Sequence, residues 1–500
     1  MIVDVTYFKI IKSVALVSFF ITLTLTGLNA FSLEQAVYQS IHTNPEVKAK
    51  INNFKSINRE KDIVRAAYFP TLNLSTGVGK AKDLIVPAYR ISGAVVTRKD
   101  SSLIAKLNLF QGFHTYHDVA SQSSRENAAS SYVKETKSSI ALKTIESYIA
   151  MMKQKAIVEI SKENVFSHKE IYEKLKEKEK SGIGKASDLG FASGRLTLAK
   201  VNTVVNENNF IQSKVLFETI LGGSVDIKSL KEPIFDYTLP KTLEDAALMA
   251  LDYNPSILVG KYNSLSAKSN YQRSRSVFYP SLDFEVKGSL FEEQGPFDYS
   301  VDSSYAMFYL NFNLYNGSAD KATMQKERFT LHQNQQVLNA TKREVTKKLG
   351  TAWIASVQIK KQLTLLSKMR VFSKKTMEDY YAEFGIGRRT LLDLINVKND
   401  YNNARQSYEV AKYDLLLSKF RILDAMGGLV NYFLAKADTM NLELDNTKTE
   451  HKSVYEIIRE MDKKLKNNET FVPYNQSDHT SLDKALKNKQ SKKVDDIEGF

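Results

Sequence analysis

The sequence has no cysteine among its 500 residues, only nine prolines, and no internal apolar run long enough for a transmembrane helix. The lack of cysteine excludes disulfides, thiolate metal sites and a cysteine nucleophile. A helix needs about 20 apolar residues to span a bilayer, so a mature chain that crosses a membrane would have to do so as β-strands in a closed barrel. The motifs GxxxxGK[ST], HExxH, GxSxG and GxGxxG are also missing. We therefore assign no catalytic residue, no metal site and no cofactor.

The amino terminus has the pattern of a secretory signal. Lys9 and Lys12 precede an apolar run from Val14 to Leu25, and small or polar residues follow up to Ala30. The alternative is a short membrane anchor, but this run is shorter than the roughly 20 residues that span a bilayer. We predict a signal peptide at 1–30.

The chain is basic, with a formal net charge of +14. This charge would suit nucleic acid, anionic lipid or an acidic cargo. The secretory signal argues against nucleic acid, and the sequence contains no aromatic and basic recognition motif. We predict that nucleic acid is not a partner.

The remaining sequence contains two copies of one unit. Asn44-Pro45 returns as Asn254-Pro255 and Phe69-Pro70 as Tyr279-Pro280, both 210 residues later, whereas Gly112 returns as Gly317, 205 residues later. The first copy thus has a longer connection between Leu72 and Leu107, which indicates a surface loop. The predicted organisation is a first repeat at 31–232, a linker at 233–241, a second repeat at 242–445 and a polar tail at 446–500. We expect the tail to be disordered, with a partner contact as the alternative.

Long helices are predicted where proline is missing, at 88–232 and 297–472. Proline costs about 3 kcal/mol inside a helix, so these tracts can carry very long ones. A helix from Gly317 to Gly387 would be about 100 Å long at 1.5 Å per residue. Apolar residues step by three and four along the chain, which indicates coiled-coil packing. In the second copy this seam contains Leu394, Val397, Tyr401, Ala404, Tyr408, Ala411 and Leu415; in the first it contains Leu189, Ala192, Leu196, Ala199, Thr203, Asn206 and Phe210.

Strands are predicted between the Phe-Pro or Tyr-Pro signal and the glycine signal of each copy. Apolar and polar residues alternate there, most clearly at Ala306, Phe308, Leu310, Phe312 and Leu314. Strands with one apolar and one polar face are typical of transmembrane barrels. Four strands per chain cannot close a barrel around a channel, so the sequence predicts an oligomer.

Together these motifs resemble the TolC-like outer-membrane efflux and type I secretion family over about residues 32 to 435. Besides the proline signals, the resemblance rests on Tyr315-Asn316-Gly317 and on two hairpin motifs, Gly182–Leu189 and Phe384–Leu394. The resemblance implies mixed α and β membrane proteins: long antiparallel coiled-coil helices forming an α-barrel in the periplasm, and a 12-stranded β-barrel completed by a homotrimer in outer-membrane lipid. It also implies docking on a periplasmic adaptor and on an inner-membrane ABC or proton-driven transporter. Gly-Lys-Ala-Ser-Asp in the first hairpin, followed by Gly194-Arg195-Leu196, is more similar to protein exporters than to drug-efflux members.

The resemblance also implies a gate beside the second hairpin. The family's tyrosine, arginine and two aspartates fall on Phe384, Arg389, Asp393 and Asn396, and only the arginine and the first aspartate are retained. Arg388 adds a cation beside them. The adaptor-docking residues implied are those of the two hairpin turns: Gly182, Gly184, Lys185, Ser187, Asp188, Gly385 and Gly387.

Helix capping is the alternative role for the hairpin aspartates. Thr390 followed by Asp393 fits a capping box, and Ser187-Asp188 fits a helix start. The alternative for the whole protein is a coiled-coil periplasmic or surface scaffold without a pore. That reading explains the helices but not the alternating strands.

Overall fold

The computed structural model describes residues 31–82, 95–295 and 298–439. The predicted signal peptide at 1–30 and tail at 446–500 lie outside them. Apart from Gly222–Ser224, these described residues form one compact unit. All elements below belong to this unit. None of its described helices is long and apolar enough to cross a bilayer.

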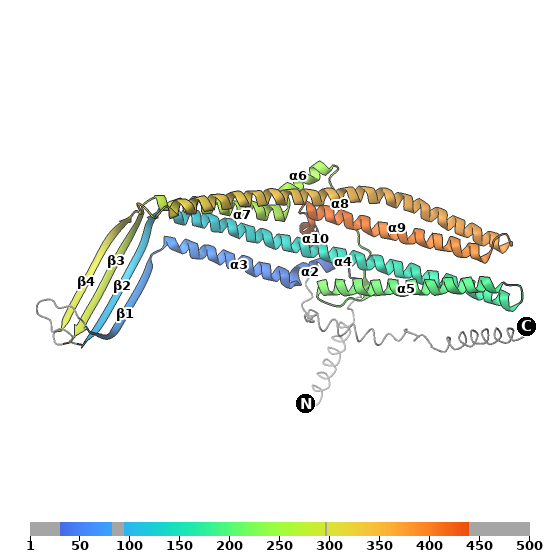
Figure 1. Ribbon diagram of the computed structural model, residues 1–500, viewed down its shortest axis with the longest axis horizontal. Coiled ribbons are helices and arrows are strands. Elements are labelled where there is room, and N and C mark those ends of the chain that lie inside the picture. The colour runs from blue at the N-terminus through green and yellow to red at the C-terminus, as the bar shows by residue number, and fades with distance from the viewer. Residues whose placement is uncertain (1–30, 83–94, 296–297, 440–500) are drawn as a thin grey trace, which may run out of the picture. The chain divides into compact units, whose positions relative to one another are not determined.

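The order of elements runs twice through the same series (Figure 1). The first series is α2 (Leu33–Thr43), α3 (Pro45–Arg65), β1 (Thr71–Lys82), β2 (Val95–Gln111), α4 (His114–Lys180) and α5 (Ala186–Leu221). The second is α6 (Leu243–Tyr253), α7 (Pro255–Ser274), β3 (Ser281–Gln294), β4 (Tyr299–Asn311), α8 (Ala319–Gly385) and α9 (Leu391–Ala425), with α10 (Leu429–Thr439) after it. The predicted combination of very long helices with four strands is confirmed.

The repeated Asn-Pro pairs mark helix starts. The Asn44 side chain accepts a hydrogen bond from the Glu46 amide, and Pro45 occupies the first turn of α3. Asn254 and Pro255 do the same for α7. Proline suits this position because the first amides of a helix have no acceptor within it.

The repeated glycines allow the sharp turn from strand to helix. Gly112 and Gly317 have φ angles of 59° and 57°, in the left-handed region. A Cβ atom on Gly112 would lie 2.4 Å from the Ser276 carbonyl oxygen. Glycine is therefore required at Gly112 for both conformation and space.

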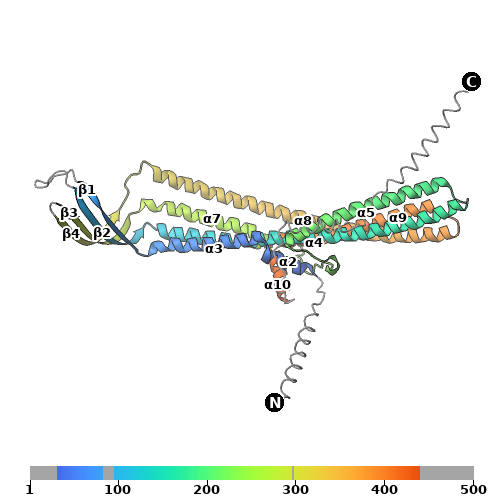
Figure 2. The same cartoon turned by 90° about the horizontal axis from the view of Figure 1, so that it is seen from below.

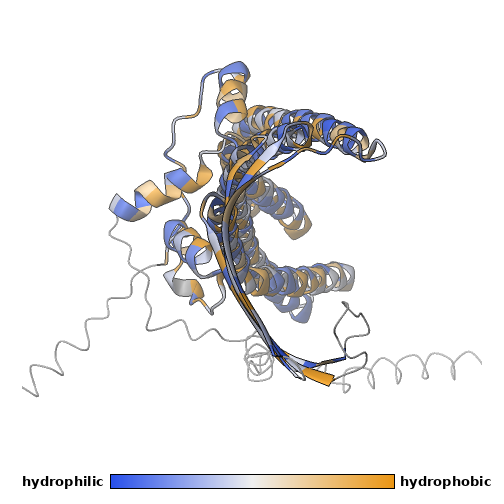
Figure 3. Ribbon diagram, turned by 90° about the vertical axis from the view of Figure 1, so that its left-hand side faces the viewer, coloured by the Kyte–Doolittle hydropathy of each residue, from blue (hydrophilic) through white to orange (hydrophobic). Residues whose placement is uncertain are grey.

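The four strands form one antiparallel sheet in the order β1-β2-β3-β4, and its end view in Figure 3 is curved. The register sets apolar residues of all four strands side by side: Leu72 pairs with Ala105, Ala105 with Val286, and Val286 with Ala306. The opposite face is polar, where the Tyr305 hydroxyl donates to Glu285 Oε1 at 2.9 Å. The predicted alternation thus extends across the whole sheet.

The predicted continuation of the last strand through Phe312 and Leu314 is wrong for the single chain, because β4 ends at Asn311. The reason is that β4 lies at the sheet edge. The equivalent end of β2 stays extended to Gln111 because it pairs with β3 as far as Ser281. Residues 312–316 follow the same pattern but lie beyond the last pairing of β4, which joins Ser281 to Asn311.

The long helices lie side by side, with α4 and α8 running from the sheet to the hairpin turns (Figures 1 and 2). In the half nearer the sheet, α3 packs on α4, α4 on α7, and α7 on α8. In the other half, α5 packs on α4, α4 on α9, and α9 on α8. The predicted seams face inward: Leu394, Val397, Ala404 and Ala411 are buried on α9, as are Ala192, Leu196, Ala199 and Thr203 on α5.

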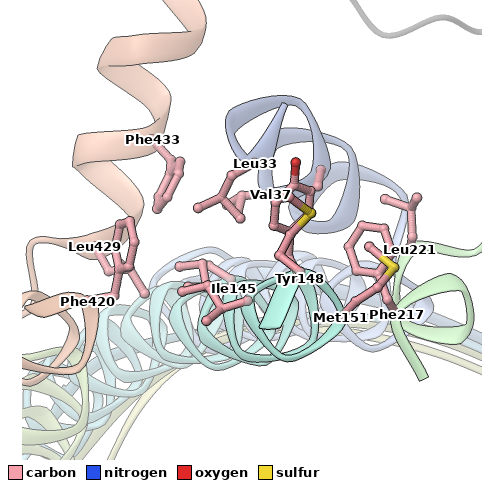
Figure 4. Close-up of a cluster of buried hydrophobic side chains, with 14 of the residues drawn as sticks. Leu33, Val37, Ile145, Tyr148, Met151, Phe217, Leu221, Phe420, Leu429 and Phe433 are labelled. Atoms are coloured by element: carbon pink, nitrogen blue, oxygen red, sulfur yellow. The ribbon is translucent and has the colours of Figure 1, made fainter. Parts of the chain in front are cut away.

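The largest cluster of buried side chains lies where the two halves meet (Figure 4). Tyr148 of α4 is fully buried there and packs edge-on against Phe217 of α5, with ring centroids 5.4 Å apart. Its hydroxyl donates to the carbonyl oxygens of Phe31 and Lys231, at 3.2 and 2.6 Å. Leu33 and Val37 of α2 and Leu429 and Phe433 of α10 complete the cluster. The short helices are therefore fixed to the long ones at this level.

Polar side chains join α4 of the first repeat to α9 of the second; we call this contact the α4–α9 seam. Three ion pairs cross it: Glu146–Arg421, Lys153–Asp414 and Glu163–Arg405. Three hydrogen bonds cross it as well: Ser138–Asp424, Asn164–Asn402 and His168–Asn399.

Asp424 makes this seam sensitive to pH. Burial raises the pKa of Asp424 to about 6 from an ordinary 3.8, and the Glu146 charge adds to it, against the hydrogen bond from Ser138 and the charge of Lys348. Because the folded pKa lies above the unfolded one, protonated Asp424 stabilises the fold most below pH 3.8, and this stabilisation is lost as the pH rises to about 6.

Asp424→Asn should remove this loss of stability with rising pH, because asparagine does not titrate. Between pH 4 and pH 7 the thermal midpoint of the variant, measured by circular dichroism, should rise relative to that of the parent. A difference between the two midpoints that stays constant over this range would contradict the assignment to Asp424.

Candidate functional site: the paired helix-hairpin turns

Two tight turns, between α4 and α5 and between α8 and α9, lie together at the end of the helices away from the sheet (Figure 1). Gly182 and Gly387 have φ angles of 75° and 77°, which glycine adopts without strain. The Ile183 amide donates to the Lys178 carbonyl oxygen at 3.1 Å, and the equivalent Arg388 amide donates to that of Glu383 at 2.9 Å. The two turns therefore have the same backbone construction.

A small apolar cluster holds the two hairpins against each other. Ile171 and Leu175 of α4 and Ala192 of α5 pack with Leu391, Leu394 and Ile395 of α9. Phe384 of α8 packs against this cluster, and the Lys178 ammonium lies 5.3 Å from its ring centroid. Phe384 therefore packs against apolar side chains, whereas the tyrosine of the family pattern at this position could form a hydrogen bond through its hydroxyl.

Arg389 is bound within its own hairpin. Its Nε donates to Glu383 Oε2 at 2.7 Å, and its guanidinium lies 4.0 Å from the ring centroid of Tyr380. The hydrogen bond to Glu383 raises the pKa of Arg389 above its ordinary value, so Arg389 stays charged. The sequence reasoning missed both partners because it matched positions around the turn. Tyr380 lies one helical turn before Phe384, a spacing that could have indicated a second aromatic side chain on the same side of α8.

Asp393 is a helix cap, as the alternative interpretation predicted. The Thr390 side chain accepts from the Asp393 amide at 3.2 Å, and Asp393 Oδ2 accepts from the Thr390 amide at 2.9 Å. This backbone hydrogen bond holds the pKa of Asp393 below its ordinary value. The carboxylate is therefore charged near neutral pH and is still partly open to solvent.

The other residues of the predicted gate are at the surface. Arg388 is exposed in the turn, and Asn396 is exposed on α9, one helical turn after Asp393. The structure therefore brings Arg389 to Glu383 and Tyr380, and Asp393 to Thr390, while leaving Arg388 and Asn396 free to face a lumen or a partner.

The first hairpin presents most of its predicted docking residues to solvent. Gly182, Lys185 and Ser187 are exposed, as are Gly385 and Gly387 of the second hairpin. Asp188 lies in the first turn of α5, as expected for a helix start. Gly184 is more constrained, because a Cβ there would lie 2.7 Å from the Glu179 backbone nitrogen.

The apolar face of the sheet is a second candidate functional surface. Leu72, Phe308 and Leu310 are 70, 68 and 70 % exposed there. Exposed aromatic side chains gather where the strands meet the helices: Tyr68, Phe69, Phe113, Tyr279, Phe312 and Tyr315. An apolar band bordered by aromatic residues is the arrangement by which transmembrane strands meet lipid.

Comparison with known proteins agrees with this architecture. The family model described as outer membrane efflux protein matches residues 36–223 and 247–428, one match in each copy of the repeat. The chain belongs to the outer membrane efflux protein family. Members of this family are outer-membrane efflux channels, so the predicted location and transport role are confirmed.

Individual members of the family are similar along most of the chain. The outer membrane efflux protein BepC of Brucella suis is 20% identical over 451 residues, which cover 89% of this chain and 95% of BepC. Outer membrane protein TolC of Vibrio cholerae is 21% identical over 395 residues, covering 73% and 83%. The Campylobacter jejuni CmeC outer membrane channel superposes with a TM-score of 0.70 at 16% identity, covering 82% of this chain and 90% of that one. The TolC-like resemblance is thereby confirmed, and the pore-free scaffold gains no support.

Proposed function

We propose that this outer membrane efflux protein is a passive duct, formed by a homotrimer, that carries substrates from the periplasm to the exterior in a tripartite export system. The observation that carries the proposal is that the sheet of one chain is open at both edges and could be continued by further copies of the chain. β1 and β4 are the unpaired edges of its four-stranded sheet. Four strands are too few to enclose a channel, whereas twelve from three copies are enough.

The internal repeat supplies the geometry of closure. Inside the chain, β2 of the first repeat pairs with β3 of the second, in a register that includes Leu107 with Phe284. The equivalent pair across a subunit boundary is β4 with β1, which sets Phe312 beside Leu74 of the partner subunit. Pairing there would extend β4 through 312–316 as β2 is extended by β3. In that case β4 ends at Asn311, and not beyond Leu314 as predicted, only because the single chain has no partner for residues 312–316.

The helices support the same closure. Leu365 and Phe372 of α8 are 66 and 67 % exposed, and Val205 and Leu216 of α5 are 51 and 55 % exposed. Single chains rarely leave apolar faces of this extent on two helices uncovered. Packing α8 against α5 of a second copy would bury both faces.

The partners follow from the two ends of the duct. The apolar face of the sheet, with its aromatic border, suits outer-membrane lipid, and the exposed hairpin turns would dock on a periplasmic adaptor that joins the duct to an inner-membrane ABC or proton-driven transporter. In this arrangement Arg388, Asp393 and Asn396 would line the narrow inner end, with one carboxylate ring at Asp393. Protein export and small-molecule efflux both fit this duct. The side chains perform no bond-making step in it.

The proposal is tested by separating outer from inner membranes and weighing the detergent-extracted protein without heating. A heat-sensitive trimer in the outer-membrane fraction is expected. A monomer, or a species confined to the inner membrane or the soluble fraction, would overturn it.

A further inference from the structure

The helix hairpins α4–α5 and α8–α9 match residue for residue, which allows contacts to be transferred from one repeat to the other. α4 and α8 each have 67 residues, with α4 beginning at His114 and α8 at Ala319, 205 positions later. α5 begins at Ala186 and α9 at Leu391, which is the same offset. The α4–α9 seam therefore has a defined counterpart between subunits, α8 against α5 of a second copy.

The ion pairs of the α4–α9 seam have no equivalents in this counterpart. The position of Glu163–Arg405 is taken by Lys368 and the partner's Lys200, two like charges. The positions of Lys153–Asp414 and Glu146–Arg421 are taken by the neutral pairs Gln358 with the partner's Asn209 and Thr351 with the partner's Leu216.

The three hydrogen-bonded pairs are also changed: Ser138–Asp424 becomes Arg343 with the partner's Thr219. Asn164–Asn402 becomes Met369 with the partner's Thr197, and His168–Asn399 becomes Ser373 with the partner's Gly194. Lys200, Lys368, Met369 and Thr197 are all exposed in the single chain, so they are available for such a contact.

We infer that the wall of the duct has two unequal kinds of seam, and that the seam between subunits, α8 on α5 of a second copy, is the weaker one and parts first. This inference rests on the proposed ring of subunits. The α4–α9 seam is held by three pairs of opposite charge, whereas the equivalent positions of the subunit seam hold two neutral pairs and one lysine pair. Opposite charges in contact favour association and like charges oppose it. The difference in charge therefore makes the subunit seam weaker than the α4–α9 seam.

The position of the seam can be tested by cross-linking, because the chain has no cysteine of its own. The double variant Met369→Cys with Thr197→Cys should be joined into covalent trimers by a short bis-maleimide. Met369→Cys with Asn208→Cys is the matched control, because Asn208 is also exposed but lies about 16 Å farther along α5. Equal cross-linking of both variants, or none in either, would overturn the register.

The charge at the seam is tested by a reciprocal exchange at Lys368 and Lys200. Lys368→Glu alone and Lys200→Glu alone each create an opposite-charge pair, and each should raise the temperature at which the trimer dissociates by about 2–4 °C. The double exchange restores like charges, so its dissociation temperature should return to that of the parent. Conductance in planar bilayers should follow the inverse order, lower in each single variant and restored in the double one.

The outcomes separate the inference from the function on which it rests. A stable trimer whose dissociation temperature and conductance do not change in either single variant would overturn the weak subunit seam while leaving the duct intact. A parent protein that never forms a trimer would overturn both. Circular dichroism of each variant checks that the helices themselves are unaffected, which is expected because both lysines are exposed in the single chain.

Discussion

Arginine in place of Phe308 is expected to abolish assembly of the proposed trimer in the outer membrane. Phe308 lies on the apolar face of β4, paired with Phe284, and is 68 % exposed. A lipid-facing arginine costs about 2–4 kcal/mol near the middle of a bilayer, and a trimer would carry three of them. The measurement is the amount of heat-sensitive trimer in outer-membrane fractions on unheated gels.

The neighbouring residue provides the control for this change. Tyr309 is also on β4 but on the opposite face, where it pairs with Asp283. Tyr309→Arg introduces the same side chain toward the polar face and should assemble nearly as well as the parent. Equal loss of trimer in both variants would mean that the apolar face does not meet lipid.

Removing Arg389 and Asp393 together should raise the conductance of the trimer in planar bilayers. The Arg389→Ala change breaks the bond to Glu383 and the stacking on Tyr380 that hold the second hairpin turn. The Asp393→Ala change removes the carboxylate that would form the charged ring at the narrow end. A looser turn and a wider constriction both favour the passage of ions.

Thr390→Ala separates a gate from a simple helix cap. It removes the hydroxyl that accepts from the Asp393 amide, at a cost of about 1 kcal/mol in helix stability, but leaves both charges in place. We expect its conductance to stay near that of the parent. If Thr390→Ala raises conductance as much as the double variant does, Arg389 and Asp393 act only by ordering the turn.

The sequence was informative about the fold wherever a local rule applied. The Asn-Pro pairs, the glycines at the ends of strands and the spacing of Leu394, Val397 and Ala404 each reflect a local backbone or packing requirement. The end of β4 could not be predicted in this way, because a strand also needs a partner and the outer edge of β4 has none among the described residues.

The candidate site was less predictable for a similar reason. The capping box of Thr390 and Asp393 spans three residues and is readable from the sequence. The contact of Arg389 with Glu383 and Tyr380 depends on how the chain returns through the turn, which sequence spacing does not determine. Matching positions to a family pattern directed attention to Phe384 and missed the aromatic ring that Arg389 contacts.

The equal length of α4 and α8 constrains how this protein could change in size. Each helix has 67 residues, and both must reach from the sheet to the same level of hairpin turns. An insertion in one helix would shift it against the helices packed on it, whereas an insertion of seven residues would keep every apolar side chain on its face. Because α5 and α9 return along α4 and α8 from the hairpin turns, a longer or shorter duct requires coordinated changes in whole heptads in the arms of both hairpins. The connections at the far end of the sheet are free of this requirement, since that between β1 and β2 already differs in length from that between β3 and β4.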